Sequence, residues 1–411
     1  MLSLCCFTGY AVIEAGAAQH FSSYDLQPNT ELMTLGTTTN IKYIEQQKEP
    51  LRRPNYHGDT DRPTIKTLKS DFYHHRGLHA EQKNIDGIRS TYQLVNQSPQ
   101  ECDQIEGVTV EHGELPKKRL GRLYLHKMTE DRVLKVVQNM DMPAILDMKW
   151  CHHMVYGLPL LAIANASGQV LIYALEDGNS STVLKLFCQY EIGKDTLVLS
   201  LDWSTNRIQS ERPQLTLSDS KGNITLLELN EGMTMKQTFL AHDFEAWITA
   251  FDCWNPNIVY TGGDDSKFKK FDARTGTAVV TSRAHDAGVT SIHSNVYKEF
   301  LLVTGSYDEN VNVWDTRKLR SPLFSQSVGG GVWRLKFDPH HGELLLAACM
   351  HNGFHVVDIN DKLQVKASFS GHESLAYGAD WYCGLENSTK TVASASFYDH
   401  LLCLWEFTVP T

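Results

Sequence analysis

A short apolar, polar, apolar unit recurs along most of this sequence. In its clearest copy, residues 300–317, an apolar run leads into a polar turn at Asp308, and apolar alternation then continues to Trp314. Alternating apolar residues on both sides of a turn predict two antiparallel strands. Related patterns occur at residues 258–274 and 391–407. A sheet unit that recurs at a regular period constrains the architecture of a chain before any function is considered.

The turn position recurs along the chain, and its successive spacings are 54, 44, 43, 43 and 48 residues. The equivalent positions are Ser167, Lys221, Asp265, Asp308, His351 and Asp399. A WD-repeat blade has a period of about 40–45 residues, so the longer spacings indicate loop insertions. The sequence therefore predicts a WD-repeat β-propeller, an all-β fold built from radially repeated four-stranded sheets.

Each unit also opens with a six-residue strand. These strands are predicted at residues 145–150, 198–203, 246–251, 289–294, 332–337 and 376–381. In addition, His242 and His285 each precede a turn aspartate, Asp265 and Asp308, by 23 residues. In WD-repeat blades such a histidine bonds the turn aspartate, and a buried polar network of this kind must be fully satisfied. We interpret these residues as structural rather than catalytic.

A degenerate seventh unit is predicted at the N-terminal end. Residues 24–38 have the pattern of a strand, a turn and a second strand, and residues 119–126 have that of an outer strand. The last unit lacks a fourth strand, and the apolar run at residues 4–13 can supply it and close the ring.

The chain is therefore expected to form a single seven-bladed propeller. Residues 1–44 would hold the closing strand and the start of the first blade, and residues 118–411 the remaining blades. Residues 45–117 are polar, charged and aperiodic, which favours a disordered insertion. We expect residues 2–18 to be a closing strand rather than a signal peptide, because no Lys or Arg precedes the apolar run.

Composition narrows the classes of function. The net charge is −10 and the isoelectric point about 6.0, which argues against direct nucleic-acid binding. The nine cysteines form no CxxC pair and suit a reducing compartment, so a cytoplasmic location is expected. No apolar run reaches the ~18 residues of a membrane span. We further expect a monomer that holds no cofactor and no metal.

Several segments resemble the diphthine methylesterase family of WD-repeat proteins. They are residues 144–152, 199–204, 244–251, 330–334, 345–351, 377–381 and 396–400. The resemblance implies that the protein partner is translation elongation factor two, whose modified histidine is the substrate. It implies hydrolysis of the methyl ester of methylated diphthine to diphthine and methanol, before the final amidation in diphthamide biosynthesis.

Candidate catalytic residues are sought where the repeat pattern is broken, because sequences break local rules mostly at functional or strained sites. Gly-x-Ser-x-Gly and HExxH motifs are absent from the sequence. His351 occupies the place of the turn aspartate. Because the pKa of histidine lies near neutrality, His351 suits a general base, and the alternative is a solvated turn residue. Glu245 precedes an inner strand, where it positions water, accepts a cationic group of the substrate, or is a solvated loop charge. Arg334 and Asp147 share the third inner-strand place, where Arg334 stabilises an oxyanion, binds a carboxylate, or forms a structural ion pair with a neighbouring blade. Cys349 is a thiol nucleophile beside His351 or a buried strand residue.

Three aromatic residues are candidates for substrate binding. Trp247, Trp333 and Tyr377 occupy the second place of three inner strands. Aromatic faces bind a trimethylammonium group, which the implied substrate carries, although packing between blades is the alternative. Two other functions compete with ester hydrolysis, because a fold does not dictate function. They are a non-catalytic scaffold and a ubiquitin-ligase substrate receptor, the latter suggested by the Asp-x-Arg ends at residues 272–274 and 315–317.

Overall fold

The computed structural model describes residues 4–7, 10–16 and 42–47 as backbone strands, and residues 119–129, 134–177, 182–383, 388–399 and 401–408 with their side chains. The segments Met1–Leu51 and Arg119–Thr411 form one compact unit that contains every strand described. The predicted strand pair at residues 24–38 lies outside the described residues. So does the predicted insertion, apart from residues 45–47.

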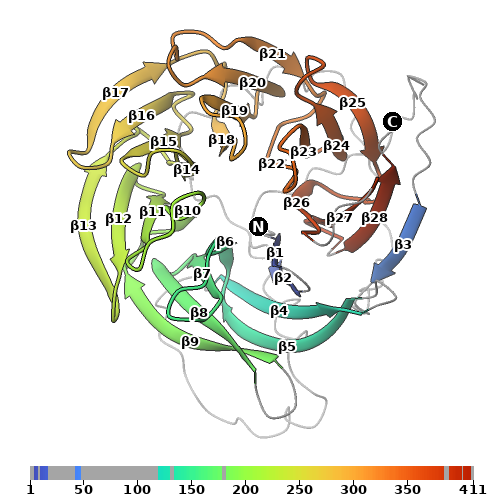
Figure 1. Cartoon of the computed structure of the whole chain (residues 1–411), viewed down its shortest axis with the longest axis horizontal. Helices are drawn as coiled ribbons and strands as arrows, with labels where there is room; N and C mark the ends of the chain where they lie inside the picture. The colour runs from blue at the N-terminus through green and yellow to red at the C-terminus, as the bar shows by residue number, and fades with distance from the viewer. Residues whose placement is uncertain are drawn as a thin grey trace, which may run out of the picture. The chain divides into compact units, whose positions relative to one another are not determined.

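Six evenly spaced sheets of four antiparallel strands make up most of this unit (Figure 1). The first two consist of β6 (Ile145–Trp150), β7 (Leu160–Asn165), β8 (Gln169–Asp177) and β9 (Thr182–Glu191), and of β10 (Val198–Trp203), β11 (Gln214–Asp219), β12 (Asn223–Leu229) and β13 (Met233–Leu240). The next two consist of β14 (Ile248–Phe251), β15 (Ile258–Gly262), β16 (Phe268–Asp272) and β17 (Thr277–Ser282), and of β18 (Val289–Ser294), β19 (Leu301–Ser306), β20 (Asn310–Asp315) and β21 (Phe324–Ser327). The last two consist of β22 (Arg334–Phe337), β23 (Leu344–Ala348), β24 (Phe354–Asp358) and β25 (Gln364–Phe369), and of β26 (Ala376–Trp381), β27 (Thr389–Ser396), β28 (Leu402–Thr408) and β3 (Lys42–Gln47).

One further sheet completes the set, in the order β1 (Leu4–Phe7), β2 (Tyr10–Gly16), β4 (Leu120–Met128) and β5 (Leu134–Pro143). The innermost strands contact one another in the order β1, β6, β10, β14, β18, β22, β26, and β26 contacts β1 again. Figure 1 shows these strands around the centre of the unit. The prediction of an all-β propeller is confirmed.

The predicted inner strands are found in the predicted places. Four have the predicted bounds, while β14 and β22 begin two residues later, at Ile248 and Arg334. In these two, the residue where the strand was expected to start donates its N–H to the preceding sheet, Ala246 to Asp219 at 3.1 Å and Val332 to Ser306 at 2.9 Å. The inner strands are therefore hydrogen-bonded to the neighbouring sheet before they enter their own.

The closing strand differs from the prediction. The last sheet is completed by β3, which pairs with β28 from Leu402↔Gln47 to Glu406↔Lys42, and not by residues 4–13. The apolar N-terminal run instead folds back on itself, because β1 and β2 pair as a hairpin with Leu4 opposite Ile13. Since β2 also pairs with β4, this run is already used inside its own sheet and cannot close another.

The interpretation of His242 and His285 as structural is confirmed. His285 Nδ1 lies 2.9 Å from Asp308 and its Nε2 2.7 Å from Thr304 Oγ1, which also accepts a bond from Trp314 Nε1 at 2.9 Å. His242 makes the equivalent bonds to Asp265 and Thr261, both at 2.8 Å. Burial alone would raise the pKa of the Asp308 carboxyl, but His285 together with the N–H groups of Asp286 and Asn310 outweighs burial and holds that pKa below its ordinary value.

Tryptophans at the ends of inner strands connect neighbouring sheets. Trp203 Nε1 donates to the carbonyl of Lys149 and Trp381 Nε1 to that of Lys336, each at 2.9 Å. Trp203 is fully buried and Trp381 nearly so. The bulky residue that ends an inner strand therefore combines apolar burial with a satisfied indole N–H, which a buried tryptophan requires.

Candidate functional site

The three candidate aromatic residues lie together at the starts of their inner strands. Trp247 and Trp333 directly precede β14 and β22, and Tyr377 is the second residue of β26. The ring centroids of Trp247 and Trp333 are 6.0 Å apart, and those of Trp333 and Tyr377 are 4.8 Å apart. Their strands belong to three different sheets, and in each the aromatic residue is the second of the predicted inner strand. Trp333 is largely buried, while Trp247 and Tyr377 are half-buried. The structure therefore places the three predicted binding residues in one cluster.

Sequence reasoning missed further members of this cluster. Tyr307 lies 6.2 Å from Trp247 and 6.1 Å from Trp333, and Phe397 lies 5.3 Å from Tyr377, all between ring centroids. Each of these residues directly follows the serine that ends the second strand of its sheet: Tyr307 follows Ser306 in β19, and Phe397 follows Ser396 in β27. The first residue after this strand thus lies at the same end of the propeller as the second inner-strand place. That periodicity could have identified these residues. We call Trp247, Tyr307, Trp333, Tyr377 and Phe397 the aromatic cluster.

Two carboxylates lie at the edge of the aromatic cluster. Trp247 Nε1 donates to Asp264 Oδ1 at 3.0 Å. The half-buried Glu245 is connected to the same strand end, because the Asp264 N–H donates to its carbonyl at 2.9 Å. Burial raises the pKa of Tyr307 well above its ordinary value, and Tyr377, Asp264 and Glu245 raise it further. The surroundings of this phenol are therefore negative, which favours a cation.

A glycine run brings the chain close to this cluster. A Cβ at Gly330 would lie 2.2 Å from the carbonyl oxygen of Cys349, and one at Gly331 would lie 2.9 Å from Met350 Sδ. A side chain at residue 330 would therefore push the chain away from the neighbouring strand. Without one, Trp333 donates its N–H to Ala348 at 2.8 Å and is fixed in the cluster.

Arg334 does not face the aromatic cluster but pairs with Asp147. Its Nη2 lies 3.2 Å from Asp147 Oδ1, and both side chains are largely buried. Asp147 Oδ2 also accepts bonds from Ser200 Oγ and the Leu201 N–H, each at 3.1 Å. Burial alone would raise the Asp147 pKa, but Arg334, Lys149 and the Leu201 N–H outweigh burial and lower it. The structure shows an ion pair of Arg334, but with Asp147 in a sheet that is not its neighbour, rather than with the neighbouring blade that was expected.

A second layer of charge lies two residues further along the inner strands. Lys149 Nζ is 3.2 Å from Asp202, and Lys336 Nζ is 3.4 Å from Asp380. Between them His293 Nδ1 accepts the N–H of Phe337 at 3.0 Å. Burial lowers the pKa of His293 well below its ordinary value, and Lys336 lowers it further, so this imidazole is neutral. Since side chains alternate along a strand, the charged third place could have predicted the charged fifth place.

His351 is separate from both groups. It is exposed at the turn between β23 and β24, and no hydrogen bond, ion pair or ring contact joins it to Glu245 or Arg334 among the residues described. Cys349 is fully buried, and burial raises its thiol pKa far above the ordinary value, which leaves no thiolate to attack an ester. The structure therefore favours a buried packing residue, which lies directly after β23 rather than within a strand.

The described residues contain no group of three or more metal-ligating side chains. His355, four residues after His351, has both ring nitrogens occupied, by Asn352 at 3.0 Å and Ser368 at 2.8 Å. No helix in the described part of the chain is long and apolar enough to span a membrane.

The aromatic cluster, with the carboxylates of Asp264 and Glu245 beside it, is suited to binding a cation over its aromatic faces.

Comparisons with known proteins agree with this fold. Residues 276–315 match the family model for the WD domain, G-beta repeat. A chain of the solved structure titled "Crystal Structure of Mitotic Checkpoint Complex" aligns with a TM-score of 0.54 at 17% identity, over 70% of this chain and 83% of that one. At this identity the likeness concerns the fold alone.

Closer relatives carry a more specific name. The chain is 44% identical to "Diphthine methyltransferase" of Mus musculus, over 71% of this chain and 63% of the mouse protein, and so spans less than two thirds of that relative. It is 42% identical to the protein of the same name in Homo sapiens, over 70% of this chain and 67% of the human protein. The "Diphthine methyltransferase homolog" of Dictyostelium discoideum is 34% identical, over 71% of this chain and 89% of that protein.

Proposed function

Because this chain belongs to the diphthine methyltransferase family of WD-repeat proteins, we propose that it hydrolyses the methyl ester of methylated diphthine on translation elongation factor two. The products are diphthine on the protein and free methanol, and the acid then becomes available for the final amidation. The reaction takes place in the cytoplasm, and the protein works as a monomer whose further sheet is its seventh blade.

The aromatic cluster carries this proposal. Methylated diphthine bears a trimethylammonium group, and such a cation is held over the faces of Trp and Tyr rings, most strongly where it is desolvated. Trp247 and Trp333 present two indoles 6.0 Å apart, with Asp264 bonded to one of them. Trp247 and Tyr377 are only half-buried, so part of each ring is exposed to a side chain of a substrate protein.

Glu245 is the best placed of the candidate catalytic groups. In the proposed reaction a water molecule attacks the ester carbonyl, and Glu245 accepts a proton from that water. The acyl carbon to methoxy-oxygen bond then breaks, and the methoxide takes the proton from Glu245 and leaves as methanol. His351, on the exposed turn between β23 and β24, is the second candidate for this base, and a His351→Ala variant tests it separately.

Arg334 acts at a distance in this scheme. Its guanidinium pairs with Asp147 in the centre of the propeller, while the preceding residue, Trp333, belongs to the aromatic cluster. The ion pair therefore holds the start of β22, and with it the indole of Trp333, in position. Arg334 is therefore a positioning residue in this scheme.

Methyl transfer is the second candidate activity, because the relatives are named as methyltransferases. The two reactions change the substrate mass in opposite directions. Purified protein is therefore incubated with elongation factor two carrying the diphthine methyl ester, and in parallel with the demethylated factor plus S-adenosylmethionine. The modified peptide is followed by mass spectrometry.

Loss of one methylene unit from the ester, together with methanol, supports hydrolysis. A gain of mass in the parallel reaction supports methyl transfer instead. An unchanged mass in both, with the factor bound, would identify a scaffold. A ubiquitin-ligase receptor would in addition bind a ligase subunit through the arginines at the outer strand ends, which are paired with Asp272 and Asp315.

A further inference from the structure

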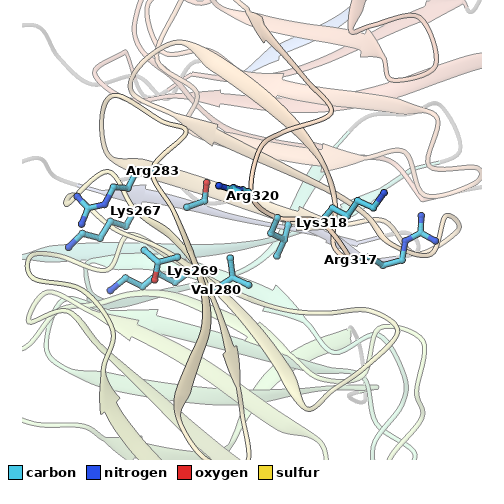
Figure 2. Close-up of a pocket in the computed structure, with 10 residues that line it drawn as sticks. Lys267, Lys269, Val280, Arg283, Arg317, Lys318 and Arg320 are labelled. Carbon is cyan, nitrogen blue, oxygen red and sulfur yellow. The ribbon is translucent and has the colours of Figure 1, made fainter.

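An open groove of about 870 Å³ lies at the side of the propeller, away from the aromatic cluster. It is formed by β16, β17 and the loop that joins β20 to β21 in the next sheet. Six of its lining residues are cations, and none is an anion: Lys267, Lys269, Arg283, Arg317, Lys318 and Arg320. Figure 2 shows these side chains spread along the groove, from Lys267 and Arg283 at one end to Arg317 at the other. In a chain with a net charge of −10, this concentration of positive charge is unusual.

Half of the cations are occupied by neighbouring groups. Lys267 pairs with Asp243 and, at 3.2 Å, with Asp265. Lys269 donates to the carbonyl of Ala241. Arg317 makes two bonds to Asp315, at 2.8 and 2.7 Å. These three residues are therefore not free binding groups, and carboxylate partners compensate the charges of Lys267 and Arg317.

The other three cations are available. Arg283, Lys318 and Arg320 are exposed, and within the described part of the chain their side chains take part in no ion pair or side-chain hydrogen bond. Two of them are guanidinium groups, which bind carboxylates through two parallel hydrogen bonds. Like charges placed together without a counter-ion repel one another, and an anionic ligand would relieve that repulsion.

The floor of the groove has the features of a peptide site. Val280 and the buried Leu319 supply aliphatic surface. Ser282 also lines the groove and is only 4% exposed, yet its hydroxyl has no hydrogen-bond partner. A buried hydroxyl without a partner costs about 1–3 kcal/mol, which a ligand with a polar backbone would recover.

The strand that forms one wall has a free edge. β17 is the outermost strand of its sheet and pairs only with β16 in the structure as described. An edge strand presents unpaired N–H and C=O groups to which an extended peptide can add. Cations in a row beside such an edge would select a peptide whose side chains are acidic.

Nucleic acid fits the same groove less well. None of the lining residues is aromatic, so bases would have no ring on which to stack. The net charge of −10 also repels a long polyanion at a distance, whereas a short acidic segment meets only the local positive field. The combined features therefore favour a peptide over an oligonucleotide.

We propose that the groove between β17 and the β20–β21 loop binds an extended acidic peptide segment of a partner protein. The segment pairs with the free edge of β17, and its carboxylates bind Arg283, Lys318 and Arg320. This site is independent of the proposed ester hydrolysis and of the aromatic cluster.

The test uses the full chain and a labelled twelve-residue peptide in which glutamate alternates with threonine. Binding is followed by fluorescence anisotropy at low and at moderate salt. The R283E/R320E double variant should weaken binding about tenfold or more, which corresponds to about 1.4 kcal/mol. The matched K194E/K221E variant reverses two exposed lysines in other sheets with the same change in net charge, and it should bind the peptide like the unaltered chain.

Two further probes define the ligand. A peptide with glutamine in place of glutamate should not bind. An acidic peptide methylated at alternate backbone nitrogens keeps its charge but cannot pair with β17, and it should bind about tenfold more weakly. Equal binding by R283E/R320E and K194E/K221E would overturn the proposal, as would undiminished binding of the methylated peptide. Tighter binding of a twelve-residue oligouridylate than of the acidic peptide would assign the groove to RNA instead.

Discussion

Arg334 and Asp147 form an ion pair of 3.2 Å across the centre of the propeller, although they are 187 residues apart. Arg334 begins β22 and Asp147 lies in β6, and on the shorter way around the ring two inner strands, β26 and β1, separate them. Both side chains are largely buried, and Asp147 is further bonded to Ser200 and Leu201. The pair therefore joins opposite sheets that share no backbone hydrogen bond.

Removal of one partner should be costly. Arg334→Met leaves the Asp147 carboxylate buried without its counter-charge, which typically destabilises a protein by about 3–5 kcal/mol. We expect a loss of this order in the free energy of unfolding measured in urea. The double variant R334M/D147L should recover only part of the loss, because it removes the unpaired charge but leaves Ser200 Oγ and the Leu201 N–H without their acceptor. A single variant as stable as the unaltered protein would contradict a buried, interacting pair.

The same pair predicts a dependence of stability on pH. The pKa of Asp147 is lower in the folded protein than in the unfolded chain. The ionised carboxylate therefore stabilises the fold fully at pH values above the pKa that Asp147 has in the unfolded chain. This contribution is lost as the pH falls toward the pKa of Asp147 in the folded protein. The stability advantage of the unaltered protein over R334M/D147L should therefore be full near neutral pH and shrink from about pH 4 downward. An advantage that grows on acidification would have the wrong sign for a lowered pKa.

The blade histidines and the candidate His351 should behave oppositely. His285→Ala removes the bonds to Asp308 and Thr304 and leaves buried polar groups unsatisfied, so it should destabilise by about 2–3 kcal/mol. His351→Ala changes an exposed turn residue and should alter stability by less than about 0.5 kcal/mol. Thermal unfolding of the two variants checks both values. Any loss of ester hydrolysis in His351→Ala would then report on chemistry rather than folding.

The parts of the fold and of the candidate site that the sequence predicts are those fixed by the period of the repeat. The inner strands, the His–Asp relation of His285 and Asp308 and the grouping of Trp333 with Tyr377 all depend on position within one blade, and the sequence pattern gives that position directly. The closing strand depends instead on which distant segment pairs with β28. Apolar character alone did not distinguish residues 4–13 from β3.

The contacts at the centre of the propeller also depend on which distant segments meet, so the sequence pattern does not predict them. Asp147 and Arg334 were recognised as charged residues at equivalent places, but which inner strands face each other depends on the number of sheets in the ring. The basic groove escaped the sequence reading because its cations come from two segments, residues 267–283 and 317–320, in different sheets. Residues 317–320 carry three cations in four positions, but the sequence does not show that they face residues 267–283.

Trp333 should matter for binding rather than for the chemical step. Trp333→Leu removes a ring that contacts both Trp247 and Tyr377 but keeps apolar volume, and loss of a cation–π contact costs about 1–2 kcal/mol. We expect KM for the ester-bearing factor to rise about tenfold or more, with kcat changed little. The control is Trp254→Leu, whose ring packs under Arg207 elsewhere in the structure. An equal effect of both variants would argue against a cage.

The thiols should not take part in catalysis. Cys349 is fully buried and its thiol pKa is raised, so it should resist iodoacetamide in the folded protein. Cys349→Ala should keep ester hydrolysis within about threefold of the unaltered protein, after correction for the stability lost to a small cavity. Rapid inactivation by iodoacetamide, with the label mapped to Cys349, would restore the thiol as nucleophile.

The central claim is that this chain uses water to cleave the acyl–oxygen bond of a methyl ester. The most direct measurement is the reaction of purified protein with the ester-bearing elongation factor two in water labelled with heavy oxygen. The account predicts that the modified side chain loses its methyl group and gains one labelled oxygen in the carboxylate, while the methanol is unlabelled. An ester of unchanged mass, or a lost methyl group without the label, would contradict it.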